Sequence, residues 1–365
     1  TEKKLFFERT LELAHLAWGN THPNPMVGAI IVEEGKIVAE GYHHQVGFPH
    51  AEVEAIRGLG RTPRKGASIF VSLEPCSTTG HTPPCVQGIL NAGIKKVYIG
   101  ATDPNPSHSG LGIEILRKSG VYVEMASEEF QSRATRLNFI FNYNITTGNP
   151  LIALKLAESS NGMLAEVNGQ PSQITENMAR SDMMGWRRLF PAICVGAGTV
   201  MADNPRLTAR LPQETFCPVR LVLDAKLSTF DQAISCPTLY TDNYASRTKV
   251  ITTITGSNNQ RACKRANELG IDLFETDQDE NGRIDLTCLR QILQEFEVNG
   301  VYCEGGAKIA KSLLNHEMVD YFFRYQSPKV LEGPDALKGP KLDNFEIIDS
   351  ITQKLGDDIL THGFL

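Results

Sequence analysis

The sequence predicts two α/β domains in one chain. Its 365 residues exceed what a single hydrophobic core usually supports. Short apolar runs alternate with segments of helical periodicity, and this alternation indicates sheets covered by helices on both faces. The alternation breaks around residues 142–150, "NYNITTGNP", before a second series begins. We therefore expect one domain over residues 1–145 and another over residues 146–365.

The first domain is expected to open with a helix and a β-hairpin. Residues 5–18 carry apolar side chains on roughly one helical face. The apolar runs 26–32 and 36–42 are joined by "EEG", a connection typical of a hairpin. Further along, the expected helices are 50–59, 84–93 and 112–120, and the expected strands are 67–74, 95–101 and 121–126.

The second domain shows the same alternation. Its expected strands are 150–157, 192–200, 219–225, 249–253, 300–306 and 319–331, and its expected helices are 176–190, 259–270, 286–300 and 307–316. The stretch "TDQDENGRIDL" at 276–286 lacks the closing glutamate of a calcium loop, so we expect an exposed turn there.

The charge balance argues against a nucleic-acid-binding protein. Lys and Arg number 36 against 42 Asp and Glu, a formal net charge of −6, whereas a phosphate-tracking surface needs a basic footprint. The opening stretch "TEKKLFFERTLELAHLAW" has too short an apolar run for a secretory signal or a membrane span. We therefore expect a cytoplasmic protein that binds neither nucleic acid nor membranes.

The eight cysteines fall into two groups. Six are scattered, several of them inside apolar runs, and are interpreted as small buried side chains. Cys76 and Cys85 instead lie nine positions apart in "EPCSTTGHTPPC", each directly after a proline that stiffens the backbone. In a reducing cytoplasm such a pair indicates metal binding or catalysis before a disulfide.

A histidine upstream completes a candidate metal site. His50 in "PHAEVEAI" adds an imidazole to the thiols of Cys76 and Cys85, and this nitrogen-and-sulfur set suits zinc. Three protein ligands leave the fourth position to water, as in catalytic zinc sites, where the pKa of that water falls towards about 7. The alternative interpretation is that both cysteines are core thiols and that His50 caps a helix.

Glu52 is the candidate proton carrier. It follows His50 by two residues, and hydrolysis at an amidine-like ring carbon needs a group that moves a proton from water to the leaving ammonia. The order H-x-E followed by P-C-x-n-C is the signature of zinc deaminases that act on cytosine-like or adenine-like amines. Here eight residues separate the cysteines, where two are usual.

Longer motifs resemble one family of such deaminases. "THPNPMVGAIIV", "GYHHQVGFPHAEVEAI", "SLEPCSTTGHTPPC" and "DPNP" are similar to the deaminase half of the bifunctional riboflavin-biosynthesis deaminase/reductase family. "LKLAESSNG", "GAGTVMADNPRLTAR", "RLVLD" and "CEGG" resemble its reductase half more loosely. The resemblance implies an N-terminal cytidine-deaminase-like α/β/α domain and a C-terminal dihydrofolate-reductase-like α/β domain.

The resemblance also implies a two-step reaction. The first domain, with Zn²⁺, would remove the ring amino group of 2,5-diamino-6-ribosylamino-4(3H)-pyrimidinone 5′-phosphate as ammonia. The second, with NADPH, would reduce the ribosyl portion to ribityl. The partner is thus a small pyrimidine ribosyl phosphate, and the family favours a homo-oligomer joined through the reductase domains.

The family's site residues carry over to positions in this chain. The zinc ligands match His50, Cys76 and Cys85, and the proton shuttle matches Glu52. The deaminase substrate positions are Asn24, His43, His81, Asp103 and Asn105. The cofactor positions are Lys155, Ala157, Thr199, Asp203, Gly305 and Gly306, and the reductase substrate positions are Ser172, Arg187, Leu207, Arg210 and Glu304.

Arg187 and Arg210 are the two arginines among the substrate positions. A guanidinium can bind a phosphate through two parallel hydrogen bonds, although Arg187 fits a solvated helix face equally well.

Three positions depart from the family pattern. His81 stands where the family has Lys or Arg, and Asn161 where it has Asp. The Trp expected before "IT" is missing, which leaves the alignment of Ser172 open by one residue.

The sequence leaves three other functions open. The first is a deaminase whose reductase domain is degenerate and non-catalytic, which the departures at Asn161 and near Ser172 motivate. The second is a nucleic-acid base editor, which would need a basic groove and usually two residues between the cysteines. The third is a non-enzymatic zinc module, in which a fourth protein ligand would close the site and Glu52 would be dispensable.

Overall fold

The chain folds into two compact units in a computed structural model that describes residues 2–78, 83–168, 170, 172–233, 235–342 and 345–365. Unit 1 covers Thr1–Asn149 and unit 2 covers Pro150–Leu365. The division falls within the segment where the alternation breaks. Residue 145, the boundary predicted from the sequence, lies inside helix α6 (Phe139–Thr147), so the change of pattern marks a helix that precedes the division.

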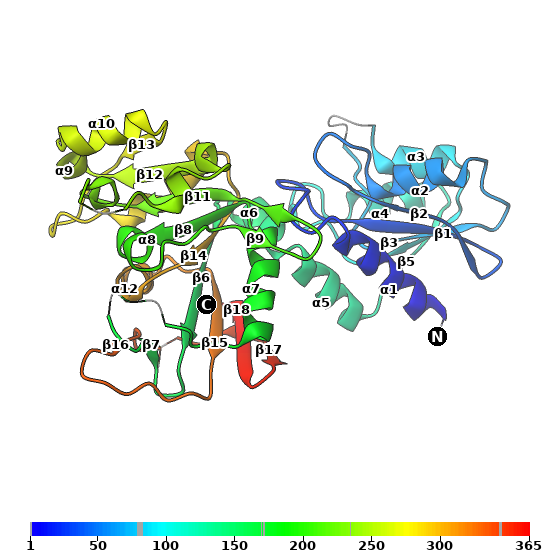
Figure 1. The fold of residues 1–365 in the computed structure, drawn as a ribbon. Coiled ribbons are helices and arrows are strands. Elements are labelled where there is room, and N and C mark those ends of the chain that lie inside the picture. The colour runs from blue at the N-terminus through cyan, green and yellow to red at the C-terminus, as the bar shows by residue number, and fades with distance from the viewer. Residues whose placement is uncertain (1, 79–82, 169, 171, 234, 343–344) are drawn as a thin grey trace. The chain divides into compact units, whose positions relative to one another are not determined.

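A five-stranded sheet forms the centre of unit 1 (Figure 1). Its strand order is β2 (Lys36–Tyr42), β1 (Gly28–Glu33), β3 (Ser68–Val71), β4 (Lys96–Ile99) and β5 (Tyr122–Met125). β1 runs antiparallel to both β2 and β3, whereas β3, β4 and β5 are parallel to one another. The predicted hairpin and the later strands therefore form where the apolar runs place them.

Helices cover both faces of this sheet, as the alternation predicts. α1 (Glu2–His15) and α5 (Glu128–Leu137) lie on one face. α2 (Ala51–Leu59), α3 (Cys85–Asn91) and α4 (Leu111–Lys118) lie on the other.

Each face of the sheet has its own hydrophobic core. Every residue of β1 is buried, and successive side chains of a strand point to opposite faces. Ala29 and Ile31 consequently pack in the core beneath α2 and α3, whereas Ile30 and Val32 pack in the core beneath α1 and α5. This burial on two sides explains why the strand is a continuous apolar run in the sequence.

A glycine sets how closely α2 lies against the sheet. A β-carbon on Gly41 of β2 would stand 2.4 Å from the backbone nitrogen of Ala55 and 2.5 Å from the carbonyl oxygen of Ala51. Only a residue without a side chain fits at this distance. The contact holds the first turn of α2, which includes Glu52, against the sheet.

Unit 2 is built on a nine-stranded sheet of order β13-β12-β11-β8-β14-β6-β15-β18-β17. These strands are β6 (Leu151–Glu158), β8 (Ala192–Gly196), β11 (Val219–Leu223), β12 (Thr248–Thr252), β13 (Asp272–Glu275), β14 (Gly300–Glu304), β15 (Tyr321–Gln326), β17 (Ile348–Leu355) and β18 (Asp358–Phe364). Neighbours from β13 to β15 are parallel, whereas β18 pairs antiparallel with both β15 and β17.

Helices pack on both faces of this second sheet as well. α11 (Leu289–Glu295) and α12 (Ala307–Asn315) contribute to one core, and α8 (Ala197–Asp203) and α10 (Gln260–Glu268) to another. α7 (Asn177–Leu189) packs its Trp186 ring against Phe323 of β15, with 4.7 Å between ring centroids. The shorter elements are α9 (Ile254–Ser257), β7 (Met163–Ala165) paired with β16 (Leu337–Lys338), and β9 (Ala209–Arg210) paired with β10 (Thr215–Phe216).

Some predicted elements of unit 2 differ from the observed ones. The predicted strand 192–200 ends at Gly196, where the chain turns directly into α8. The predicted strand 319–331 is limited to β15, because Pro328 lacks the N–H group that a strand would need there. No apolar pattern predicts the final hairpin, since β17 is largely exposed and polar. Residues 276–286 form a turn closed by a bridge between Gln278 and Ile284.

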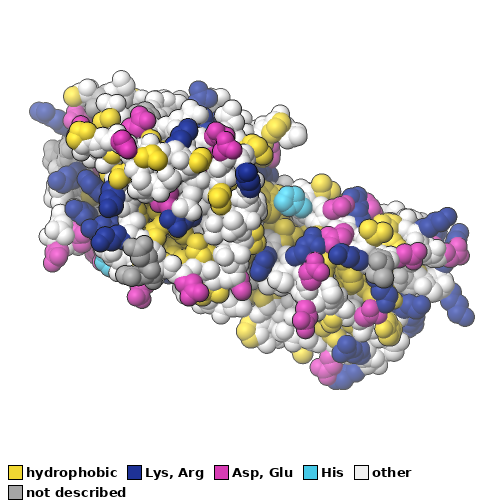
Figure 2. Space-filling view, turned by 90° about the horizontal axis from the view of Figure 1, so that it is seen from below, with side chains coloured by type: hydrophobic (Ala, Val, Ile, Leu, Met, Phe, Trp, Pro, Cys, Tyr) yellow, Lys and Arg dark blue, Asp and Glu magenta, His cyan; other side chains and the backbone are white. Residues whose placement is uncertain are grey.

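The surface view in Figure 2 shows basic and acidic side chains interspersed on the face displayed. Among the helices that the structure describes, none combines the length and the apolar character needed to cross a bilayer.

Gly41→Ala tests the close approach of α2. We expect it to lower the free energy of unfolding by roughly 1–3 kcal/mol, the usual cost of overpacking, because the new β-carbon would meet backbone atoms. Gly58→Ala, within α2 itself, is the matched control. Its β-carbon would lie 3.6 Å from the nearest backbone oxygen, so it should stabilise by about 1 kcal/mol. Urea denaturation measures both, and equal effects would contradict the role of Gly41.

Candidate functional site

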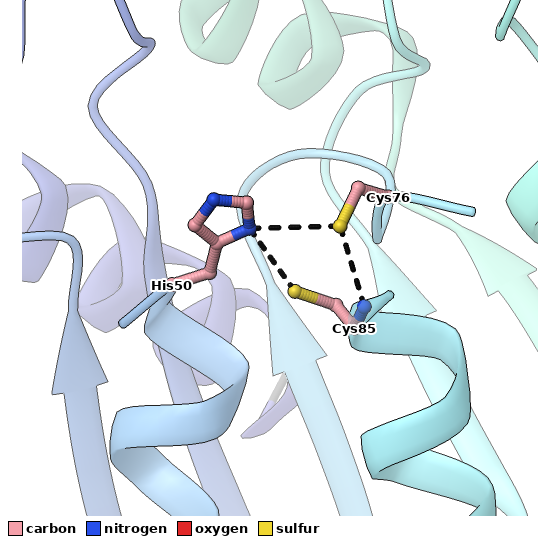
Figure 3. A group of neighbouring side chains, drawn as sticks. All are labelled: His50, Cys76 and Cys85. Carbon is pink, nitrogen blue, oxygen red and sulfur yellow. Dashed lines mark hydrogen bonds between the residues drawn. The ribbon is translucent and has the colours of Figure 1, made fainter. Parts of the chain in front are cut away.

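Three side chains from separate segments of unit 1 meet in one cluster (Figure 3). His50 occupies the N-cap position of α2, Cys76 lies in the loop after β3, and Cys85 is the first residue of α3. The Nδ1 atom of His50 lies 3.2 Å from the Cys85 sulfur and 3.5 Å from the Cys76 sulfur. His50 makes no side-chain capping bond, so its imidazole serves the sulfurs and not the helix end.

The electrostatics of the two sulfurs fit a metal ion between them. Hydrogen bonds from Cys85 and His50 lower the pKa of Cys76 to about 4, whereas the bond to Cys76 and burial raise the pKa of Cys85. Two neighbouring thiolates repel each other, and a cation relieves that repulsion. The three ligand atoms lie within 4.8 Å of one another, and one imidazole with two thiols suits Zn²⁺. Within the described residues, no other such group of His, Cys, Asp and Glu occurs.

Glu52 lies beside this cluster in the first turn of α2, and only 3% of its surface is exposed. Burial, and next the negative charge of the Cys76 sulfur, raise the pKa of Glu52 to about 7. The Cys85 thiol hydrogen bonds to its carboxylate. A carboxyl group with a pKa near neutrality can both accept and return a proton.

His43 is held in one tautomer next to His50. Its Nδ1 atom donates to the carbonyl oxygen of Pro49 at 3.1 Å, so its Nε2 atom must accept from the Nδ2 atom of Asn24, also at 3.1 Å. Burial lowers the pKa of His43 and thereby favours the neutral ring that this arrangement needs. The rings of His43 and His50 pack edge-on with 5.3 Å between centroids. Two predicted substrate positions therefore adjoin the cluster.

Asp103 and Asn105 lie in the loop after β4. The Oδ1 atom of Asp103 accepts the backbone N–H of Asn105 at 2.8 Å. Burial raises the pKa of Asp103, and the charges of Glu74 and Cys76 add to this effect, which places the loop near the cluster. Glu74 is buried beside this loop and was not predicted from the sequence motifs. Its position directly before Pro75 and Cys76 was the one feature of the sequence that could have indicated it. The predicted substrate residue His81 lies outside the described residues.

A second cluster of charges lies in unit 2. Glu304 ends β14, Lys155 faces it on β6, and Arg187 reaches it from α7. Arg187 donates to both carboxylate oxygens of Glu304, at 2.5 and 2.9 Å, and the Lys155 ammonium lies 3.3 Å away. Burial acts to raise the pKa of Glu304, but the two cations outweigh it and lower the pKa to about 2. Arg187 is thus buried against Glu304, and it is not part of a solvated helix face.

Several predicted cofactor positions gather at the carboxyl ends of β8 and β14. Gly306 is the N-cap of α12, and a β-carbon on it would lie 3.5 Å from the Thr199 hydroxyl of α8. A β-carbon on Gly305 would lie 3.2 Å from the Ile309 side chain. The backbone N–H groups of a helix start that follows two glycines suit a phosphate group.

Asp203 and Ala157 lie on elements next to this edge. Asp203 ends α8, and burial raises its pKa while the nearby Lys155 acts to lower it. Ala157 lies two residues after Lys155 on β6 and pairs with Tyr325 of β15. The small side chain of Ala157 and the charge of Lys155 therefore share one face of the sheet.

Arginine side chains concentrate next to the Glu304 cluster. Arg210 donates to the Thr208 hydroxyl at 3.1 Å, and Arg187 donates to the Thr208 carbonyl oxygen at 3.1 Å. Burial lowers the pKa of Arg210, and the charges of Arg187, Arg206 and Arg180 lower it further. Arg180 and Arg206 were not predicted as site residues. Arg206 could have been predicted, because it lies in the same motif, "NPRLTAR", as Arg210.

Three remaining positions have local structural roles. The Ser172 hydroxyl accepts the backbone N–H of Glu166 at 2.9 Å, which places Ser172 on the segment after β7. Leu207 is buried with a left-handed φ of 54°. Asn161 donates to the Leu331 carbonyl oxygen at 2.8 Å and accepts the Leu331 N–H at 3.1 Å. An ionised Asp could only accept, so the amide suits this position.

Cys76→Ser tests the metal cluster. We expect the variant to lose bound zinc, because a neutral hydroxyl is a poor substitute for a thiolate ligand. Cys236→Ser is the control, since Cys236 is half-buried and lies outside the cluster. Metal content per chain, measured by inductively coupled plasma mass spectrometry, should fall only in the first variant. Full zinc content in Cys76→Ser would contradict the assignment.

Two family models match the two units of the chain separately. The cytidine and deoxycytidylate deaminase zinc-binding region matches residues 1–101, and the RibD C-terminal domain matches residues 150–361. Riboflavin biosynthesis protein RibD from Bacillus amyloliquefaciens is 38% identical, over 98% of this chain and 95% of that protein. RibD from Escherichia coli is 34% identical, over 92% of this chain and 90% of that protein.

Solved structures of similar proteins match both units. The diaminohydroxyphosphoribosylaminopyrimidine deaminase/5-amino-6-(5-phosphoribosylamino)uracil reductase of Thermotoga maritima is 32% identical with a TM-score of 0.82, covering 99% of this chain and 98% of that one. RibD of Acinetobacter baumannii is 28% identical with a TM-score of 0.77, covering 100% and 98%. The predicted α/β fold class and the family resemblance are thereby confirmed. The chain belongs to the RibD family of riboflavin biosynthesis proteins, with a deaminase-type zinc-binding region ahead of a RibD C-terminal domain.

Proposed function

We propose that this chain catalyses two consecutive steps of riboflavin biosynthesis. Unit 1 removes the ring amino group of 2,5-diamino-6-ribosylamino-4(3H)-pyrimidinone 5′-phosphate by zinc-dependent hydrolysis, and unit 2 reduces the ribosyl group to ribityl with NADPH. The observation that carries the proposal is the meeting of His50, Cys76 and Cys85 beside the buried carboxyl group of Glu52. Membership of the RibD family supports both steps, because the similar Thermotoga maritima protein is named for these two activities.

The residues of unit 1 divide the work of deamination. His50, Cys76 and Cys85 hold the zinc, which supplies the Lewis acidity that makes water a nucleophile near neutral pH. Glu52 would accept one proton from the attacking water and deliver it to the ring nitrogen as the C–O bond forms. It would then carry the second proton of that water to the amino group, which leaves as ammonia as the C–N bond breaks and the ring carbonyl forms. Its burial keeps its pKa close to that working pH.

Other residues of unit 1 orient the pyrimidine. The neutral His43 ring fixes the amide of Asn24, so this pair presents a set pattern of donor and acceptor atoms. Asp103 and Asn105 supply carboxylate and amide groups from the loop after β4. Fixed polar groups of this kind hold a substrate ring in the geometry that attack requires.

Glu52→Gln tests the deaminase step. We expect zinc to stay bound and ammonia release to fall by about 10²–10⁴-fold in kcat, the usual contribution of a positioned acid–base group. Glu54→Gln, in the same helical turn, is the control and should retain the wild-type rate. The assay follows ammonia first without NADPH and then follows NADPH oxidation after its addition.

The same assay on the wild-type protein distinguishes between the alternative functions. Ammonia release followed by NADPH oxidation supports the two-step enzyme. Ammonia release without any NADPH oxidation would favour a degenerate reductase unit instead. Neither signal from zinc-loaded protein would contradict the proposed substrate, and full activity of Glu52→Gln would contradict the role of that residue.

The residues of unit 2 suit binding of an anionic substrate and a nicotinamide cofactor. The cofactor supplies the hydride equivalent when bound, and the backbone at Gly305 and Gly306 suits its phosphates. Arg210 offers further donors for the substrate phosphate, since its hydrogen bond to Thr208 within the described part of the chain uses one guanidinium nitrogen. The charges of neighbouring arginines strengthen the attraction for a phosphate.

Arg210→Ala tests the phosphate contact. We expect KM of the reductase step to rise roughly 10- to 100-fold, because a hydrogen bond to a charged group contributes about 1.5–3 kcal/mol. Ammonia release by unit 1 should not change. Arg261→Ala, at an exposed position of α10, is the control for loss of a positive charge. A defect confined to ammonia release would contradict the division of labour between the units.

A further inference from the structure

Glu74 joins the metal-ligand loop to the segment that carries Asp103 and Asn105. It lies two residues before Cys76 and is 5% exposed. Its Oε2 atom accepts the backbone N–H groups of Asp103 and Gly110, both at 3.0 Å. Its Oε1 atom accepts those of Gly112 and Ile113, at 2.9 and 3.3 Å. One carboxylate therefore receives four backbone hydrogen bonds.

These four donors belong to two distinct pieces of structure. Gly110 is the N-cap of α4, and Gly112 and Ile113 lie in its first turn, where N–H groups lack partners within the helix. The carboxylate also suits the positive end of the helix dipole. The N–H of Asp103 belongs instead to the loop after β4, so the Oε2 atom connects this loop to the start of α4.

Close packing reinforces the same junction. A β-carbon on Gly112 would stand 2.3 Å from the carbonyl oxygen of Pro75, the residue between Glu74 and Cys76. The backbone N–H of Glu74 also donates to the carbonyl oxygen of Ala101 at 2.8 Å. The segment before Cys76 is therefore in contact with both the loop that follows β4 and the first turn of α4.

The hydrogen bond to Asp103 extends to the next predicted substrate residue. Asp103 accepts the N–H of Asn105 at 2.8 Å, and the Asn105 side-chain oxygen accepts the N–H of Ser107 at 3.0 Å. The Asn105 amide nitrogen further contacts His108 at 3.3 Å. The orientation of Asn105 thus depends on where the Asp103 backbone is held, and Glu74 holds it.

We infer that Glu74 is a positioning residue of the deaminase, which sets the distance of the Asp103–Asn105 segment from the zinc-ligand loop and so determines substrate capture. The inference rests on the proposed function of unit 1. Glu74 acts through backbone groups and is not a member of the His50, Cys76 and Cys85 cluster. Its carboxylate form matters, because an amide has one acceptor oxygen and can keep only one of the two pairs of donors.

Glu74→Gln is the test, with Glu114→Gln as its matched control. Both remove a carboxylate near the start of α4, but Glu114 is exposed and pairs with Lys118. We expect KM for ammonia release to rise roughly 10- to 100-fold in Glu74→Gln, with zinc content retained and kcat little changed. The control should match the wild type. A merely structural role would reduce the fraction of active protein, which lowers apparent kcat and leaves KM unchanged.

A double-mutant cycle with Asn105→Ala separates positioning from a general loss of stability. If Glu74 acts through Asn105, then Glu74→Gln should raise KM much less in the Asn105→Ala background than in the wild type. Fully additive effects on KM would overturn the inference. Loss of zinc from Glu74→Gln would also overturn it, because Glu74 would then act on the metal ligands.

Hydrogen exchange on the unmodified chain gives a measurement that does not depend on folding of a variant. The amides of Asp103 and Gly110 lie outside regular secondary structure, yet they should exchange slowly because Glu74 accepts them. Fast exchange at both would overturn the inference. Wild-type protein that releases no ammonia would instead overturn the proposed function and the inference with it, whereas normal release with an unchanged KM in Glu74→Gln overturns the inference alone.

Discussion

The burial of carboxylates is the physical constraint on which both sites depend. An ionised carboxylate loses hydration worth on the order of several kcal/mol when it is buried, so the fold must supply donors, cations or a proton. Glu74 receives four backbone N–H groups. Glu304 receives two cations, and its pKa falls. Glu52 is compensated less well, so its pKa rises into the range that proton transfer needs. Three chemically identical groups thereby acquire three different functions.

Parallel strands determine where these groups lie. The carboxyl ends of neighbouring parallel strands share one edge of a sheet, and the helices that follow begin there. In unit 1, Cys76 follows β3 and Asp103 follows β4. In unit 2, Glu304 ends β14, and α8 and α12 begin directly beyond β8 and β14. Backbone N–H groups of helix starts and polar side chains of strand ends therefore meet without any further insertion in the chain.

The predictability of these features follows the range of the interactions that create them. The cluster of His50, Cys76 and Cys85 could be predicted because these residues lie in short motifs, and the buried strands could be predicted because their apolar runs are continuous. The pair of Arg187 and Glu304 joins residues 117 positions apart, and only the packing of α7 on the sheet brings them together. α8 begins at Ala197 within a continuous apolar run, and the composition of that run does not reveal where the strand ends and the helix starts.

The pairing of Asn24 with His43 has a consequence for ligand design. The carbonyl oxygen of Pro49 accepts a hydrogen bond from Nδ1 of His43, so Nε2 of His43 accepts one from the amide nitrogen of Asn24. The Asn24 amide therefore cannot flip without breaking its hydrogen bond to His43. In the proposed function, the amide oxygen of Asn24 is the atom that faces the ligand. Under the proposed function, in which Asn24 orients the pyrimidine, an inhibitor should carry a hydrogen-bond donor on the ring edge that faces Asn24, and a ring with an acceptor there would meet a mismatched polar contact.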